Sequence, residues 1–561
     1  MKASHNRVVG LLRLFLLRSF DTDLVSRGGE AHRLAVTAIS VLAAASLTLA
    51  VVFVIRYLNL SERPEIAALM PLIEWRDKEF LIALSMMATA LALGLTAHTM
   101  FPDRRDAAIL GVQPVPASAL FWARTAAVCV APACLAVAIN SFTGLVFPAI
   151  TAGSDAGLRE VSRRVSIHIG VCLLAAGFVI GLTLTAQGLL SSLLPQRVRR
   201  TAAPMVQLGI LTWMILCFTS GTGPSGGGRQ EMVPTKWFLA LYQRWVGGEP
   251  MMASWLSDLA VGSLATLTVG GLGLYSIGYW KAWRQAGEEA GERCSGPGWA
   301  TRSTREFLRV TLLRKPEEEA AFYFAWRALT RNQKCQFVLA LYLSLGTGIV
   351  AVGWERLAIE GQRAGPSALA VSLPLEFTAL LAIGLRAVMP LPVELPANWV
   401  FRLHASGSPE LYGRAVRLLA VMIIVVAAVL VPLPMFAKAW GEETALQMAA
   451  LHSLVIAVLV RALYGRYHQI PFTCPYVPDK ANLRIRLGWY VLAYLFAVAL
   501  VSRAVASVLQ GATSWATLAS LLVISYQVSA WRAKRHGSTM ETVIFHEDAP
   551  PTLTMLEIEQ R

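Results

Sequence analysis

The stretch LAVTAISVLAAASLTLAVVFVIRY, residues 34–57, contains no charged residue before Arg56. A helix of about 20 such residues is long enough to cross the ~30 Å hydrocarbon core of a bilayer. The stretch is therefore predicted to span a membrane. The whole chain agrees with this, since 55% of its 561 residues are hydrophobic, only 15% are charged, and its mean hydropathy is +0.53. A soluble domain does not reach such values.

Eleven further apolar runs of spanning length follow, and they fall into two groups. The first group of six runs is at 34–57, 80–100, 119–148, 166–194, 202–220 and 256–280. The second group is at 337–357, 371–392, 414–437, 444–465, 487–508 and 513–531. We therefore predict an all-α fold, a polytopic transmembrane helical bundle of about twelve spans in two pseudo-repeated halves of six.

The formal charge of +15 is unevenly placed along the chain. Lysines and arginines gather before the first span and in alternate connections, while the opposite loops mix arginine with glutamate and aspartate. Segments held at the cytoplasmic face carry such a basic excess. We therefore expect a multi-pass protein of the cytoplasmic (inner) membrane with both termini in the cytoplasm, and no nucleic-acid partner.

These patterns divide the chain into five parts. Residues 1–33 form an N-terminal segment, in which LLRLFLLRSF at 11–20 suits either a helix lying among the headgroups or a cytoplasmic extension of the first span. Residues 34–280 form the first six-span unit, and 281–335 form a cytoplasmic linker. Residues 336–531 form the second six-span unit, and 532–561 form a cytoplasmic tail.

Two long connections occupy equivalent places in the two halves. Residues 101–124 join the second and third spans, and residues 391–414 join the eighth and ninth. The first runs from Pro102 to Arg124 and the second from Pro392 to Arg414, an interval of 22 residues each time. Both are apolar and broken by prolines, which predicts short amphipathic helices. The shared layout favours halves related by an axis along the membrane normal.

The segment DRRDAAILGVQPVPASALFWAR, residues 103–124, follows a basic N-terminal helix and two spans and leads into a long third span. In this layout the chain resembles permease subunits of ATP-binding-cassette exporters of the second type, in a fused two-unit form. The resemblance implies that six spans form one permease unit and that the segment between spans two and three is a coupling helix that docks on an ATPase. The docking residues that it implies are Asp103, Arg104, Arg105 and Asp106, with counterparts at Glu394, Asn398, Trp399 and Arg402.

No phosphate-binding loop of the form GxxxxGK[ST] occurs in the chain. If the resemblance holds, ATP is bound by a separate nucleotide-binding ATPase subunit, and this chain carries no cofactor, no metal and no catalytic residue of its own. The transported substance is left open. The alternative is a twelve-span secondary transporter like those of the major facilitator class, which also has two parallel halves and carries an acidic and basic signature between spans two and three.

Three other motifs are better explained by a structural role than by a catalytic or metal site. GPSGG at 223–227 matches the serine motif of hydrolases, but a nucleophile elbow needs a strand and a helix around Ser225. In WFLALYQRW, 237–245, Trp237, Leu241 and Trp245 lie four residues apart, and this largely aromatic face predicts a helix resting at the membrane interface. In QIPFTCPYVPDK, 469–480, three prolines around Cys474 predict a stiff turn, because a metal site needs several ligands. We therefore expect no enzyme activity in this chain.

Overall fold

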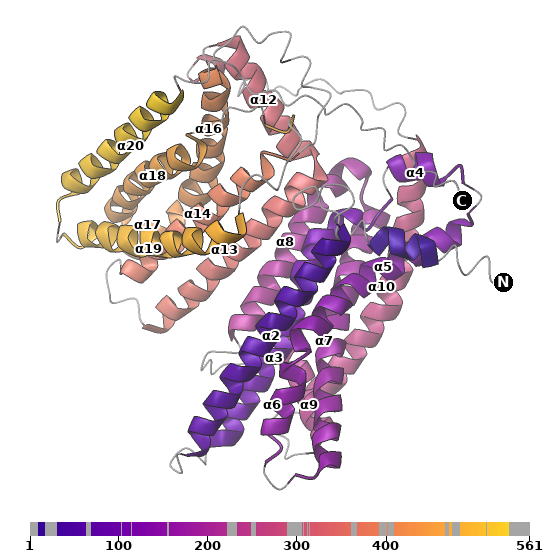
Figure 1. Cartoon of the computed structure of the whole chain (residues 1–561). Coiled ribbons are helices and arrows are strands. Elements are labelled where there is room, and N and C mark those ends of the chain that lie inside the picture. The colour runs from indigo at the N-terminus through magenta and orange to yellow at the C-terminus, as the bar shows by residue number, and fades with distance from the viewer. Residues whose placement is uncertain are drawn as a thin grey trace, which may run out of the picture. The chain divides into compact units, whose positions relative to one another are not determined.

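The computed structural model describes residues 9–16, 31–62, 69–102, 104–113, 115–153, 156–220, 233–247, 254–288, 306, 308–310, 312–313, 315–360, 367–391, 401, 409–465, 471–473, 483–511 and 513–537. Helices make up nearly all of this part, and it contains no β-strand (Figure 1). The predicted all-α class is confirmed for the described residues.

Ten helices in the described part of the chain are long and apolar enough to cross a membrane. They are α2 (Ala31–Ser61), α3 (Met70–Thr96), α5 (Ala117–Asn140), α7 (Leu158–Leu193), α8 (Gln196–Ser220), α10 (Ser254–Glu288), α13 (Gln333–Glu360), α14 (Ala368–Val388), α18 (Glu442–Tyr464) and the continuous stretch of α16 (Pro409–Val425), a π-helical turn (Val426–Leu430) and α17 (Leu433–Trp440). The last two predicted spans coincide with α19 (Leu483–Leu509) and α20 (Trp515–Gly537). In their described residues these two helices do not meet the same criterion, so twelve spans stay a prediction.

The chain divides into two compact units. The first contains residues 1–294 together with 336–356, and the second contains 295–335 together with 357–561. Most of α13 thus belongs to the first unit, although the apolar run at 337–357 is predicted to belong to the second group of six spans. The helix α13 forms a hydrogen bond within the first unit, because the hydroxyls of Thr212 on α8 and Thr347 on α13 lie 2.9 Å apart.

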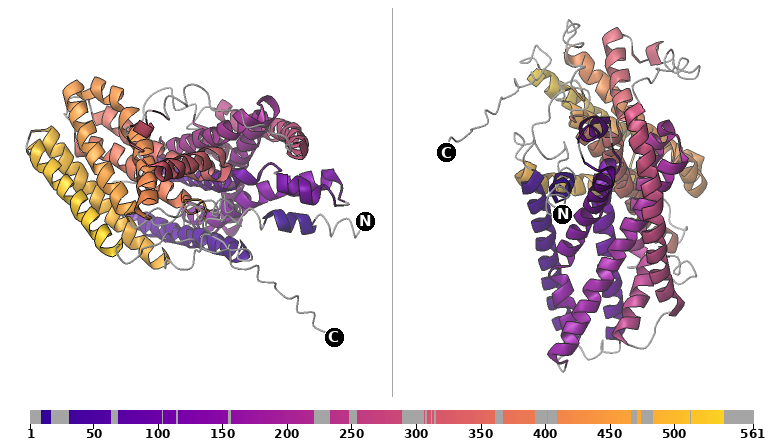
Figure 2. Two further views of the ribbon diagram at one scale, coloured as in Figure 1. Left: turned by 90° about the horizontal axis from the view of Figure 1, so that it is seen from above. Right: turned by 90° about the vertical axis from the view of Figure 1, so that its right-hand side faces the viewer.

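In the first unit the long helices run side by side along one direction (Figures 1 and 2). Three shorter helices lie at its two ends. The helix α4 (Arg104–Leu110) is at one end, whereas α6 (Thr143–Ile150) and α9 (Pro234–Val246) are at the other (Figure 1). We call these the α4 end and the α9 end.

The core of the first unit is formed by side chains from α3, α5, α7, α8, α9 and α10. The helix α9 contributes Phe238, Leu239, Leu241 and Tyr242, all of which are almost fully buried. The predicted interfacial face of α9 is therefore wrong in part, since Leu241 faces the core and only Trp245 of that face is exposed. Periodic aromatic spacing cannot tell a lipid surface from a neighbouring helix.

The single run predicted at 119–148 is in fact two helices, because the chain breaks at Ser141 and Phe142 between α5 and α6. Ser46, fully buried on α2, accepts hydrogen bonds from the backbone N–H groups of Phe142 and Thr143 at 3.1 and 3.0 Å. These amides at the start of a helix have no partner within the helix. A serine of the first span thus fixes where α6 begins.

The second unit contains α14, α16 to α20 and the linker helix α12 (Pro316–Arg331). Part of the proline-rich turn before Cys474 is described. Phe472 is fully buried, has a φ of 67°, and donates its N–H to the carbonyl of Met389 at the end of α14 over 2.9 Å. Cys474 itself lies outside the described residues.

Candidate functional site

The α4 end of the first unit contains a buried ion pair. Arg124, in the second turn of α5, donates to the carboxylate of Asp106 on α4 over 2.5 Å, and the two side chains are 3% and 4% exposed. The guanidinium of Arg124 also lies 4.7 Å from the centre of the Phe15 ring. One arginine of α5 therefore contacts both α4 and a segment about a hundred residues earlier in the sequence.

Phe15 belongs to a short helix at 9–16, and this helix packs on the start of α5. Phe15 is buried with Leu120, Ala123 and Ala127, and Leu110 at the end of α4 packs against the same cluster. The amphipathic N-terminal segment predicted from the sequence therefore contacts both α4 and the third span. A cation over an aromatic face adds about 0.5–2 kcal/mol, so the contact helps to hold the arrangement.

The outer side of α4 is apolar and exposed. Ile109 is 60% exposed and Val112, just after the helix, is 83% exposed. The helix is followed directly by Gly111, whose N–H bonds to the carbonyl of Ala107 at 3.0 Å. A Cβ at position 111 would lie 2.3 Å from that oxygen, so only glycine fits this close turn. The result is a short helix anchored on its inner side with an apolar tip on its outer side.

The residues predicted for docking are placed only in part. Asp106 points into the bundle, and its carboxylate is engaged by Arg124 rather than exposed to a partner. Arg104 and Arg105 form the first turn of α4, and their side chains lie outside the described residues. The others lie outside the described residues altogether: Asp103, Glu394, Asn398, Trp399 and Arg402.

The second long connection, 391–414, is described at Leu391, Phe401 and 409–414. Phe401 packs edge-on against Phe324 of α12, with ring centres 5.2 Å apart, and also lies 6.1 Å from the Tyr412 ring. Arg414 lies 3.6 Å from Glu318, whose side chain is 2% exposed. The linker helix α12 therefore contacts both the connection and the start of the helix that follows it.

The α9 end carries most of the other buried charges of the first unit. Asp77 on α3 accepts from Arg56 at 2.8 Å and from the Tyr57 hydroxyl at 3.1 Å. Glu79, 3% exposed, accepts from Thr235 of α9 at 3.1 Å. Charges in a membrane protein are costly unless they are paired. Here each of these two carboxylates has a hydrogen-bond partner on another helix.

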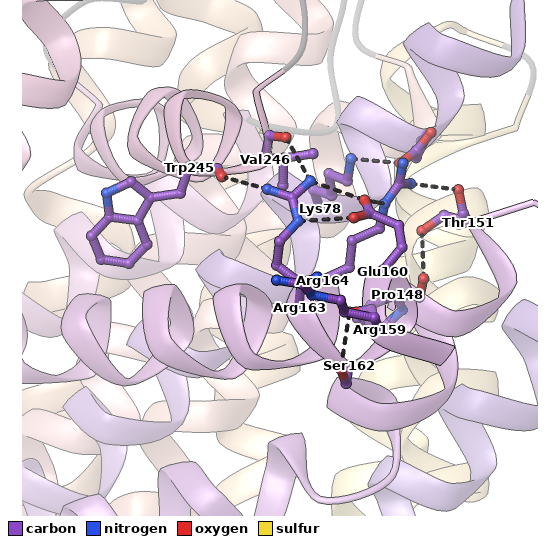
Figure 3. Close-up of polar contacts among 11 residues, drawn as sticks. Lys78, Pro148, Thr151, Arg159, Glu160, Ser162, Arg163, Arg164, Trp245 and Val246 are labelled. Atoms are coloured by element: carbon purple, nitrogen blue, oxygen red, sulfur yellow. Dashed lines mark hydrogen bonds and ion pairs between the residues drawn. The ribbon is translucent and has the colours of Figure 1, made fainter. Parts of the chain in front are cut away.

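Two arginines near the start of α7 donate hydrogen bonds to carbonyls at the C-terminal ends of α6 and α9 (Figure 3). Arg163 donates to the carbonyls of Trp245 and Val246 at 3.3 and 3.0 Å, at the end of α9. Arg164 donates to the carbonyl of Thr151 at 3.0 Å, just after α6. We call Glu160, Arg163 and Arg164 the clasp.

Glu160 orients the two arginines of the clasp. Its carboxylate accepts from Arg163 at 2.9 Å and from Arg164 at 2.8 Å. The last carbonyls of a helix lack partners within the helix and carry partial negative charge. Guanidinium groups fit these positions well, so the clasp ties α6 and α9 to one long helix. The spacing REVSRR at 159–164 was visible in the sequence, but the carbonyls that it meets were not.

Burial also shifts the acid–base properties of α9. Lys236 is 6% exposed, and burial lowers the pKa of its ammonium, while the Glu79 carboxylate acts in the opposite direction. Burial raises the pKa of the Tyr242 hydroxyl. Within the described residues, no three histidine, cysteine, aspartate or glutamate side chains lie close enough together to hold a metal ion.

Comparison of the chain with protein-family models, with curated proteins and with solved structures finds no match. The chain is a polytopic helical membrane protein by the length and apolar character of its helices. Any narrower function has to be argued from the geometry of its sites.

Proposed function

We propose that this chain is the membrane permease of an ATP-binding-cassette exporter, driven by a separate ATPase subunit, in the inner membrane with both termini in the cytoplasm. The observation that carries the proposal is the construction of α4. Its inner side is held by the buried pair of Asp106 and Arg124, and its outer side presents Ile109 and Val112. A rigid apolar projection at one end of a helical bundle suits contact with another protein.

In this proposal α4 transmits force. The ATPase would bind Ile109, Val112 and the basic residues Arg104 and Arg105. A displacement of α4 would be transmitted to α5 through the ion pair of Asp106 and Arg124. It would then be transmitted from Arg124 to the N-terminal helix through Phe15, because both contacts are close and buried. Buried ion pairs of this kind resist separation, since a lone charge left behind costs about 3–5 kcal/mol. The long helices would then move as rigid bodies.

A parallel in the second unit supports the proposal of two pseudo-repeated halves. In the first unit, Arg124 contacts a carboxylate and lies over a ring of the helix that precedes the first span. In the second, Arg414 lies beside Glu318 of α12, the helix that precedes α13. The second connection would then serve a second ATPase.

The test is purification of the full chain from its native membrane in mild detergent, followed by mass spectrometry of stoichiometric partners. We expect an ATPase with a phosphate-binding loop. Replacing Ile109 and Val112 with glutamate, or Arg104 and Arg105 with glutamate, should reduce its recovery. The matched control is Leu158→Glu, an 86% exposed apolar residue at the start of α7 near the α9 end. Recovery of the chain alone, together with transport driven by an ion gradient, would instead establish a secondary transporter.

A further inference from the structure

The linker helix α12 has one face that packs on the protein and one that does not. Its buried residues are spaced three and four apart and pack mainly on α16: Glu318, Ala321, Phe322, Ala325, Ala328 and Leu329. The opposite face near the end of the helix exposes Trp326, Arg327, Thr330 and Arg331. In the described part of the chain, the guanidinium groups of Arg327 and Arg331 have no hydrogen-bond or ion-pair partner.

The end of this face is close along the chain to a candidate membrane span. The candidate span of α13 begins at Gln333, two residues after α12 ends. Two residues of chain extend at most ~7 Å, and the four helical residues from Arg327 to Arg331 add ~6 Å. The headgroup layer of each leaflet is roughly 5–8 Å thick. Arg331 therefore lies within reach of the headgroups for any direction of α12, and Arg327 does so when α12 runs along the membrane surface.

Charge is also distributed along α12 in a way that suits this position. The three glutamates of the first turn, Glu317 to Glu319, are at the end far from the span, and Arg331 is in the last turn. Arg331 also interacts favourably with the helix dipole, but that does not explain the exposed Trp326, which is 44% accessible. Tryptophan beside arginine is typical of the membrane–water interface.

We propose that Trp326, Arg327 and Arg331 form a binding site for the headgroup of an anionic phospholipid at the start of α13. The phosphate would lie between the two guanidinium groups, and the indole would lie at the level of the ester groups. The proposal does not depend on the ATPase, since it concerns another surface and another ligand. A lipid bound there would hold α12, and with it Phe401 and Arg414, at the membrane surface.

The test uses the detergent-purified full chain and a short-chain fluorescent phosphatidylglycerol, with the matching phosphatidylcholine as the neutral probe. We expect tight binding of the anionic probe, weakened by added salt. The double variant Arg327→Gln and Arg331→Gln should bind it about 30-fold more weakly, because each cation near an anionic surface contributes about fivefold to the affinity. Trp326→Ala should also weaken binding.

Two variants control for charge and folding. Arg159→Gln with Lys438→Gln removes two exposed positive charges elsewhere and should leave binding unchanged. Arg327→Lys with Arg331→Lys keeps the charges and should retain most of the affinity. Equal binding of the neutral probe, or undiminished binding by the glutamine variant, would overturn the proposal. Displacement of the lipid by equimolar inorganic phosphate would also overturn the proposal and would assign the site to free phosphate. Loss of a co-purifying protein from the glutamine variant, with its lipid affinity intact, would likewise overturn it and would assign this face to that protein.

Discussion

Gly188 of α7 lies so close to Tyr275 of α10 that no side chain fits between the helices. A Cβ on Gly188 would be 2.6 Å from the Tyr275 nitrogen and 2.7 Å from the carbonyl carbon of Leu274. Nearby, Ser191 donates to the carbonyl of Gly278 at 2.9 Å. Small residues that let two backbones approach are characteristic of helix pairs in membranes, and α7 and α10 pack against each other extensively.

Gly188→Ala should destabilise the first unit. The methyl group would meet backbone atoms that cannot move aside, and overpacking of this kind costs about 1–3 kcal/mol. The thermal unfolding midpoint of the purified chain in detergent measures the effect. Gly273→Ala on α10 is the control, because its Cβ would meet nothing within 4 Å. It should raise stability slightly, as alanine favours a helix over glycine by about 0.5–1 kcal/mol; equal behaviour of the two variants would contradict the packing.

Asp106 and Arg124 should behave as a coupled pair. Asp106→Leu alone, or Arg124→Met alone, removes one side of a buried ion pair and should cost about 3–5 kcal/mol. The double variant removes both charges and should recover most of that loss. A double-mutant cycle of thermal unfolding midpoints checks this. Additive losses would mean that the two side chains act independently, in disagreement with their 2.5 Å contact.

The helices of this fold could be predicted because their signal is local. Each of the twelve apolar runs falls on helical residues, in most cases on a single helix, since hydrophobicity over about 20 residues depends on no distant contact. The break after Asn140 was missed for the opposite reason. It is set by Ser46, almost a hundred residues earlier, which caps α6. Such a cap cannot be read from the residues around the break.

In the candidate sites too, features with a local sequence signal could be predicted and features set by distant contacts could not. The interval from Pro102 to Arg124 indicated a short helix between the second and third spans, and α4 confirms it. That Asp106 turns inward to Arg124 was not predicted, because both a docking surface and a buried pair use charged residues. The burial of Leu241 was also missed, since the sequence does not show which face of α9 meets α7 and α10.

The two arginines of the clasp should act on different helices. Arg163→Gln removes the donors to Trp245 and Val246, so amide hydrogen exchange should become faster in the last turn of α9, where the Gly247 N–H bonds to Gln243. Arg164→Gln should instead speed exchange at Thr151, after α6. Glu160→Gln should affect both ends, and Arg159→Gln neither. A uniform change across the first unit in each variant would argue against the clasp.

Lys236 should make stability depend on pH in the alkaline range. Burial lowers the pKa of its ammonium in the folded protein below the unfolded value of 10.5. Between these two pKa values the unfolded chain binds more protons than the folded chain, so the free energy of unfolding should rise with pH. The cost of the buried charge is fully present below the folded pKa and is gone above 10.5.

The measurement is the thermal unfolding midpoint from pH 7 to pH 10.5 for the original chain and for Lys236→Met. Because methionine carries no proton to lose, the variant should lack the alkaline rise that Lys236 contributes, so the original chain should gain stability relative to the variant toward pH 10.5. Lys438→Met removes an exposed ammonium of the second unit and controls for the loss of one charge. Parallel curves for the original chain and Lys236→Met would show that Lys236 reaches water in the folded protein, contrary to its burial between α9 and its neighbours.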